Sequence, residues 1–167
     1  MKFRTLLVSS LAAFALVGCA KKEEAPASAA ATAGAPSAPA GVRTIEITGG
    51  DNMKFNLQKI EAKPGEELKI VLTNIGTQPK EVMGHNWVLL TKDADPAAFA
   101  AAAVTSKATD YIPAALQNQI IAHTAMLGPR KSDEITFKVP DVAGDYPFLC
   151  SFPAHYQVGM KGVLTVR

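Results

Sequence analysis

The sequence predicts an all-β fold, a sandwich of about seven or eight short strands within residues 42–167. From residue 42 onward, short runs of alternating or continuous apolar residues are separated by Gly, Pro and Asn, which is typical of antiparallel sheets. The exception is residues 95–119, an alanine-rich stretch without two-residue alternation. We therefore expect two packed sheets and one short helical insertion.

The expected strands follow in chain order. Residues 53–57 and 68–72 alternate apolar and polar side chains, and a Lys-Pro-Gly-Glu turn at residues 63–66 lies between them. Residues 85–90 are more continuously apolar, which predicts a central strand. The remaining strands are expected at residues 120–124, 134–139, 145–150 and 162–167.

The insertion has a helix start signal. Asp95 is a good N-cap residue, Pro96 suits the first helical position, and the alanines of residues 97–103 propagate a helix easily. A second short turn is expected at residues 113–117. The insertion carries no obvious chemical groups, so we expect it to cover one side of the sandwich.

The first 41 residues predict export and attachment to a membrane. Residues 1–18 have the features of a signal peptide, because Lys2 and Arg4 precede an apolar stretch at residues 6–16 that is too short to span a bilayer. Residues 16–19 resemble a bacterial lipobox, which implies cleavage before Cys19 and its acylation, for example by palmitate. The alternative is an ordinary signal peptide with a chance cysteine. Residues 19–41 are then the lipidated cysteine and a flexible Ala/Pro/Ser linker.

The predicted location is the bacterial cell envelope. Residue 20 is Ala and not Asp, which by resemblance to sorted lipoproteins favours the outer membrane, with the folded domain facing the periplasm. Removal of Lys2 and Arg4 with the signal reduces the formal charge from +2 to zero. No Lys/Arg cluster is interleaved with aromatics, so the sequence argues against nucleic acid binding. Phosphate-binding glycine patterns and a nucleophile elbow are also absent from the sequence.

The main candidate for chemistry is a Cys-x4-His-x4-Met sequence formed by Cys150, His155 and Met160. Thiolate and thioether sulfur favour reduced copper, and imidazole suits both oxidation states. If Cys19 is acylated, Cys150 has no disulfide partner, and metal binding or burial would protect its thiol. The second imidazole could come from His85 or His123, and spacing alone leaves both open.

Several segments resemble the azurin branch of the blue copper proteins. They are residues 82–89 (Val-Met-Gly-His-Asn-Trp-Val-Leu), 121–124 (Ile-Ala-His-Thr) and 150–155 (Cys-Ser-Phe-Pro-Ala-His), with residues 51–56 similar to the first strand of that family. The resemblance implies an eight-stranded Greek-key cupredoxin sandwich with one type 1 copper. It implies His85, Cys150 and His155 as trigonal ligands, Met160 as the axial sulfur and the Gly84 carbonyl as a weak axial contact. His123 would lie outside the first coordination shell.

The sequence departs from azurins in two respects. Four residues separate His155 from Met160, as in auracyanins, whereas azurins have three. The distance of the axial sulfur, and with it the reduction potential, therefore cannot be transferred from azurins. The disulfide of azurins also cannot form in this chain, so the fold must depend on its core and its metal.

The resemblance implies an electron carrier and not an enzyme. Too few histidines remain for the second metal site of a copper enzyme. Redox partners of the expected kind are cytochromes c, respiratory complexes, a copper nitrite reductase or a peroxidase. Apolar side chains around His155 are expected to form the docking surface, with His155 as the exit for the electron: Met53, Met83, Pro153 and Ala154. The alternatives are a copper chaperone or storage lipoprotein, and a zinc site without redox chemistry.

The resemblance also implies support around the ligands. The backbone amides of Asn86 and Phe152 are expected to donate to the Cys150 sulfur, and Asn86 is expected to tie its strand to the ligand loop. Such support would keep the site nearly unchanged between the two oxidation states of copper.

Overall fold

The computed structural model describes residues 41–167. The predicted signal peptide, Cys19 and all but the last residue of the linker lie outside the described residues, so these assignments stay predictions. Within residues 41–167, no helix combines the length and the apolar character needed to cross a bilayer.

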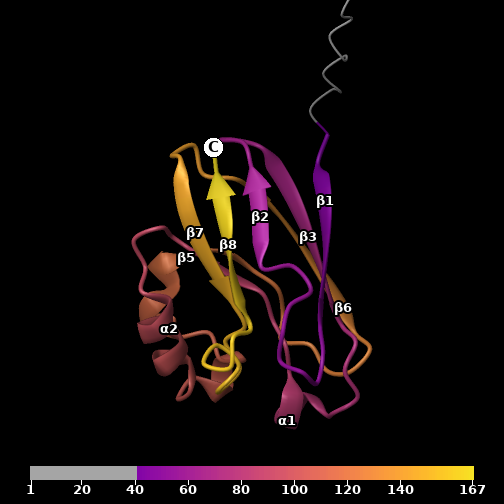
Figure 1. Ribbon diagram of the computed structural model, residues 1–167. Coiled ribbons are helices and arrows are strands. Elements are labelled where there is room, and N and C mark those ends of the chain that lie inside the picture. The colour runs from indigo at the N-terminus through magenta and orange to yellow at the C-terminus, as the bar shows by residue number, and fades with distance from the viewer. Residues whose placement is uncertain (1–40) are drawn as a thin grey trace, which may run out of the picture. The chain divides into compact units, whose positions relative to one another are not determined.

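The strands of this domain form two sheets (Figure 1). The first sheet has the order β1 (Arg43–Gly49), β3 (Glu67–Asn74) and β6 (Ser132–Lys138). The second has the order β2 (Lys59–Ala62), β8 (Lys161–Val166), β7 (Gly144–Leu149), β4 (Val88–Leu90) and β5 (Ile120–His123). β1 pairs in parallel with β3 and β2 with β8, and the other pairs are antiparallel. The predicted eight-stranded sandwich is confirmed.

The core lies between the two sheets and follows the alternation of the strands. In β3, each second residue is buried, whereas its neighbours are exposed or half-buried. Trp87 is fully buried and its ring centroid lies 5.4 Å from that of Phe148 and 5.9 Å from that of Phe137. These inward residues come from both sheets: Ile47, Leu68, Ile70, Leu72, Leu89, Phe148 and Leu164.

Two strand predictions were wrong. Residues 53–57 do not form a strand, because Met53 has a left-handed φ of 53° and only Phe55 makes an isolated bridge to Gly49. The first strand lies earlier, at Arg43–Gly49. The strand expected over residues 85–90 begins only at Val88, since His85 pairs with Leu127 through an isolated bridge.

The predicted helical insertion is confirmed. It contains α2 (Pro96–Ala103) and two short 3-10 helices, η1 (Lys107–Thr109) and η2 (Ala114–Gln119). Asp95 caps α2, since its Oδ1 accepts hydrogen bonds from the N–H groups of Ala97 (2.8 Å) and Ala98 (3.3 Å). Under α2, a second cluster of buried side chains contains Val88, Leu90, Phe99, Ile112 and Leu149. A short helix that the sequence did not predict, α1 (Lys80–Met83), precedes β4.

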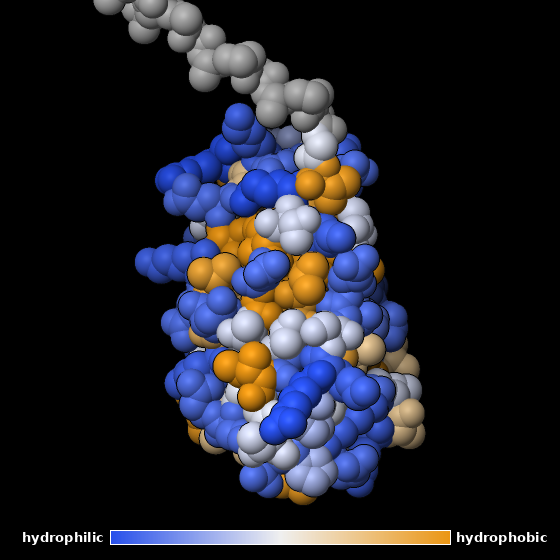
Figure 2. Space-filling model, turned by 90° about the vertical axis from the view of Figure 1, so that its right-hand side faces the viewer, coloured by the Kyte–Doolittle hydropathy of each residue, from blue (hydrophilic) through white to orange (hydrophobic). Residues whose placement is uncertain are grey.

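The domain has two distinct ends. In Figure 1, residues 150–160 and α1 lie at the lower end, and the start of β1 and the C-terminus lie at the upper end. Since β1 has seven residues, the chain enters the domain roughly 20 Å from the lower end of that strand. Figure 2 views the right-hand side of Figure 1, where hydrophobic residues gather in the middle and hydrophilic residues lie above and below them.

Candidate metal centre

The loop between β7 and β8 holds Cys150, His155 and Met160 in a closed set of backbone hydrogen bonds. The N–H of Cys150 donates to the Met160 carbonyl (3.0 Å), and the N–H of Met160 donates to the His155 carbonyl (2.8 Å). The four residues between His155 and Met160 form turns, in which the Gly159 N–H donates to the Tyr156 carbonyl (3.0 Å). Gly159 has a φ of +100°, which favours glycine. The longer spacer is therefore taken up within a hydrogen-bonded turn.

His85 joins this loop from the other side of the site. Its backbone is held by two hydrogen bonds to Leu127, one in each direction (3.1 and 2.8 Å). Its Nδ1 atom lies 3.2 Å from Nδ1 of His155, which in turn lies 3.4 Å from Sγ of Cys150. One ligand atom from each of the three residues lies within 4.8 Å of the others, and all three residues are buried. The structure thus brings together three of the predicted ligands.

This arrangement fits a first-row transition metal. Metal–nitrogen bonds of ~2.0 Å and metal–sulfur bonds of ~2.3 Å put trigonal ligand atoms roughly 3.5 Å apart. The observed nitrogen–nitrogen and sulfur–nitrogen distances of 3.2 and 3.4 Å are close to that spacing. Two imidazoles and a thiolate are the donor set of a blue-copper site. The residues present therefore fit copper.

Burial sets the protonation of these groups in the absence of metal. It lowers the pKa of His155 to about 4, with a smaller contribution from neighbouring His85, and it also lowers the pKa of His85. Both rings are thus neutral near pH 7, which is the form that binds metals. Burial raises the pKa of the Cys150 thiol to about 12, against the opposing effect of the Asn86 and Phe152 backbone amides. These amides are the groups that the resemblance implied next to the sulfur.

Met160 and Gly84 adjoin the three ligands. The Met160 side chain is fully buried, and its methyl group and the His85 ring both lie against the Cα of Gly49. The Gly84 carbonyl oxygen lies 3.9 Å from Cys150 Sγ. A side chain at Gly84 would lie 2.7 Å from the Lys80 carbonyl oxygen and 2.9 Å from the Met126 sulfur. Glycine at position 84 therefore permits close packing of the backbone beside the site.

Asn86 links the two halves of the site, as predicted. Its Nδ2 donates to Ser151 Oγ (2.8 Å), and its Oδ1 accepts from the Ser151 N–H (2.9 Å). Both residues are almost completely buried. The residue after His85 is thus fixed to the residue after Cys150, and this holds the two ligand segments in register.

The insertion also reaches the site, which the sequence did not indicate. The Tyr111 ring contacts Phe152 edge-on at 5.0 Å between centroids, and Phe152 lies 4.7 Å from the His155 ring. Lys54, from the segment after β1, donates through Nζ to the carbonyl oxygen of Val158 in the ligand loop. Sequence patterns gave no signal for either contact, since they join segments far apart in the chain.

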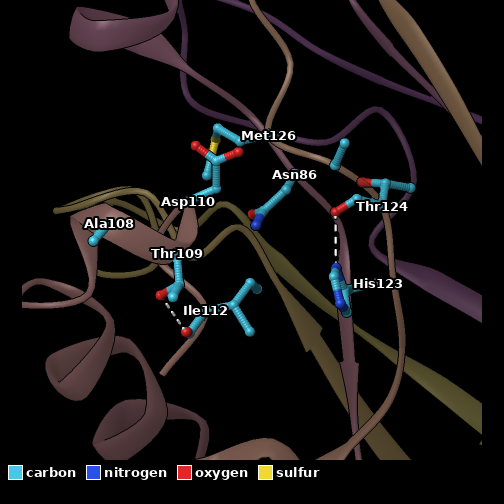
Figure 3. A pocket seen from close by; sticks show the side chains of 9 residues that line it. Asn86, Ala108, Thr109, Asp110, Ile112, His123, Thr124 and Met126 are labelled. Carbon is cyan, nitrogen blue, oxygen red and sulfur yellow. Dashed lines mark hydrogen bonds between the residues drawn. The ribbon is translucent and has the colours of Figure 1, made fainter. Parts of the chain in front are cut away.

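His123 does not belong to the ligand cluster. Its side chain is exposed and its Nδ1 lies 3.1 Å from the Thr124 carbonyl oxygen. It lines a separate pocket of about 400 Å³ between the insertion and the end of β5 (Figure 3). The choice between the two histidines that the sequence left open is therefore made by the fold, in favour of His85.

His155 is more covered than predicted. Its side chain is buried, with the residue only 2% exposed, so it does not project through the surface. Of the predicted docking residues, Ala154 is exposed and the other three are half-buried: Met53, Met83 and Pro153. Further hydrophobic residues in the segments at this end are exposed: Leu57, Ile75, Val82, Val104 and Val158.

Comparison with known proteins identifies the family. Residues 42–167 match the family model described as copper binding proteins, plastocyanin/azurin family, and the chain belongs to this family. An azurin of Bordetella pertussis is 39% identical over 124 residues, covering 72% of this chain and 81% of the azurin. An azurin of Pseudomonas fluorescens biotype A is 36% identical over 134 residues, covering 74% of this chain and 97% of the azurin.

Solved auracyanin structures are similar to this chain in fold. Dithionite-reduced auracyanin from Roseiflexus castenholzii has a TM-score of 0.66 at 37% identity, and the match covers 76% of this chain and 99% of the auracyanin chain. Auracyanin A of Chloroflexus aurantiacus, described as a "blue" copper protein, has a TM-score of 0.67 at 31% identity, with coverages of 76% and 100%. The chain is thus an azurin-like blue copper cupredoxin. The cluster of His85, Cys150 and His155 is consistent with one type 1 copper.

These relationships support a blue copper electron carrier. At the level of the family they also support a protein that is not an enzyme.

Proposed function

We propose that this chain carries single electrons between redox partners through one copper ion bound by His85, Cys150 and His155. The observation that carries the proposal is the convergence of two imidazole nitrogens and one thiol sulfur in a buried, hydrogen-bonded unit. Copper, when bound, supplies a couple between Cu(I) and Cu(II). In this proposal the Met160 sulfur and the Gly84 carbonyl oxygen would also contact the copper.

The protein's part is to keep these ligands in place while the charge of the site changes. The closed loop of residues 150–160 and the Asn86–Ser151 hydrogen bonds limit ligand movement, so little reorganisation accompanies each transfer. His155 is 2% exposed, whereas His85 and Cys150 have no exposed surface. We therefore infer that the electron leaves through the edge of His155.

The experiment is to load the purified protein with copper and record its visible spectrum. We expect an intense thiolate-to-copper band that disappears on reduction and returns on oxidation. The His85→Ala variant should lose or change this band, and the matched His123→Ala variant should keep it. A colourless copper form of the unmodified chain would contradict the electron-carrier function and leave the copper chaperone as the better explanation.

We further propose that the protein is exported and anchored through an acylated Cys19, with its folded domain facing the periplasm. The lipobox-like residues 16–19 and the following Ala/Pro/Ser segment support this proposal. Cells labelled with a palmitate analogue should incorporate the label into the unmodified chain and a Cys150→Ser variant but not into Cys19→Ser. Label in the Cys19→Ser variant would refute the attachment site.

The proposed partners are proteins that exchange single electrons, such as cytochromes c, respiratory complexes, a copper nitrite reductase or a peroxidase. The half-buried Met53, Met83 and Pro153 and the exposed Ala154 support a small apolar docking surface. Covalent crosslinking in isolated membranes, followed by identification of the crosslinked protein, tests which of these classes applies.

A further inference from the structure

The charges of the folded domain are unevenly distributed. Residues 41–167 contain thirteen Lys and Arg and thirteen Asp and Glu, so the domain is formally neutral. The segments at the ligand end, which include α1 and η1, are residues 50–58, 75–87, 104–113, 124–131 and 150–160. Together with Lys161, which begins β8, they carry six cations against three anions: Lys54, Lys80, Lys107, Arg130, Lys131 and Lys161 against Asp51, Glu81 and Asp110.

The structure places these cations at the ligand end. Lys54 bonds to the ligand loop, and Lys161 lies over the ring of Tyr156 in that loop at 4.2 Å. Lys80 pairs with Asp110 at 3.0 Å, which joins α1 to the insertion. The Arg130 N–H donates to the carbonyl of Asn74, the last residue of β3 (2.8 Å).

Few of these cations are neutralised locally. Among the described residues, Lys80 is the only one of the six in a salt bridge, whereas four other salt bridges lie elsewhere in the domain. Strand residues next to this end do not alter the balance, because Lys59 in β2 and Asp133 in β6 cancel. The ligand end therefore has an excess of about three positive charges, and the rest of the neutral domain has the same excess of negative charge.

We propose that this end docks on a redox protein whose contact face has an apolar centre bordered by carboxylates. The inference rests on the proposed electron-carrier function and adds the chemistry of the partner. Apolar side chains beside His155 would fill the centre of the contact, and the surrounding lysines would pair with the carboxylates. Charges at the rim of such a contact act chiefly on the rate of encounter and orient a neutral carrier with its ligand end forward.

The test uses the purified, copper-loaded protein on gold electrodes coated with mixed monolayers. One coating mixes methyl and carboxylate ends, one mixes methyl and ammonium ends, and one has methyl ends only. We expect electron transfer on the carboxylate coating to be at least about threefold faster than on the other two at low salt, and this advantage to fall as salt rises.

Two charge-reversal variants complete the design. Lys107→Glu changes a lysine at the ligand end, and Lys92→Glu makes the same change of net charge on the loop after β4. Both lysines are exposed, and neither is in a salt bridge within the described residues. Lys107→Glu should reduce the carboxylate advantage, and Lys92→Glu should leave it intact.

The outcomes separate the two proposals. Equal rates on all three coatings, faster transfer on ammonium, or equal effects of both variants would overturn the inference while leaving the electron carrier in place. A copper-loaded protein that is colourless and gives no reversible signal on any coating would overturn the electron-carrier function and the inference with it.

Discussion

Gly49, the last residue of β1, lies against the site without contributing a ligand. A Cβ atom at this position would overlap the Met160 methyl group and would lie 3.5 Å from two ring carbons of His85. Gly49 does not have a positive φ angle, so alanine suits its strand backbone. The Gly49→Ala variant therefore tests where the Met160 side chain lies, with little effect from backbone strain.

The structure sets the size of the effect. Non-bonded carbon atoms rest ~3.5–4.0 Å apart, so the Met160 methyl group must move by about 1 Å. Rotation about the Cγ–Sδ bond could move the methyl group alone, but Met160 is fully buried, so we expect its packed neighbours to restrict that rotation and the sulfur to shift as well. Overpacking costs about 1–3 kcal/mol, and the lower entropy of alanine in the unfolded chain offsets about 0.4–1 kcal/mol. We expect a net loss of about 0.5–2 kcal/mol in the free energy of unfolding.

Two measurements check this prediction. In urea unfolding of the copper-free protein, Gly49→Ala should lower the free energy of unfolding when position 160 is Met. The same substitution should have little or no effect when it is added to the Met160→Ala variant. The copper-loaded single variant should have a changed reduction potential, because the axial sulfur tunes it. Gly128→Ala is the control, since a Cβ there meets only ordinary contacts at 3.4 Å or more. Equal losses in both backgrounds, with an unchanged potential, would refute the contact between Gly49 and Met160.

Further predictions concern the thiol, the loop brace and the polar link. Burial raises the pKa of the Cys150 thiol to about 12, so copper binding near pH 7 should release one proton from this thiol. The affinity of the protein for copper should therefore rise about tenfold per pH unit from about pH 6 to 8. Calorimetry in two buffers of different ionisation enthalpy counts the released protons. Lys54→Met removes an exposed hydrogen bond to the ligand loop and should shift the reduction potential while costing less than about 1 kcal/mol, whereas Lys59→Met should do neither; equal potentials for both would contradict the brace. Asn86→Ala should lower the unfolding free energy of the copper-free protein by about 2–4 kcal/mol, and Ser151→Ala by about half as much, in urea titrations; similar small losses would mean that the link carries little energy.

The sequence was most informative where the chemistry is local. Cys150, His155 and Met160 lie within one loop, so their residue types and spacing indicate a soft metal site without knowledge of the fold. The second histidine ligand lies on a different segment of the chain. His85 pairs with Leu127, and His123 in β5 pairs with Val88 in β4, so the choice between the two histidines depends on strand pairing far along the chain. Without the family resemblance, spacing left this choice open.

Local polar contacts explain the strand that was wrongly predicted. Residues 53–57 alternate in polarity, yet the Asn52 side chain accepts from the Lys54 N–H, and the Asn56 side chain accepts from the Thr48 N–H. Such side-chain bonds compete with strand pairing, and Met53, which lies between the two asparagines in the chain, has a left-handed conformation. The alternation was real, but it placed only Phe55 in the core.

The role of the insertion was only half predictable. Its helix start at Asp95 and its position over a sheet follow from local sequence, and both are present. Its contact with the site depends on Asp110 and Tyr111, two consecutive residues with left-handed φ angles of 52° and 62°. This turn brings the Tyr111 ring against Phe152, and no periodic pattern encodes such a turn between helices.

Hydrogen bonds around the site connect the segments that carry the predicted ligands. The ligand loop is closed by the Cys150–Met160 backbone bond, His85 is held by two bonds to Leu127, and Asn86 joins these units. In this arrangement the ligand atoms lie 3.2 and 3.4 Å apart, close to the spacing that a bound transition metal requires. The hydrogen bonds join ligand segments that are far apart in the chain, and they position His85 beside the ligand loop.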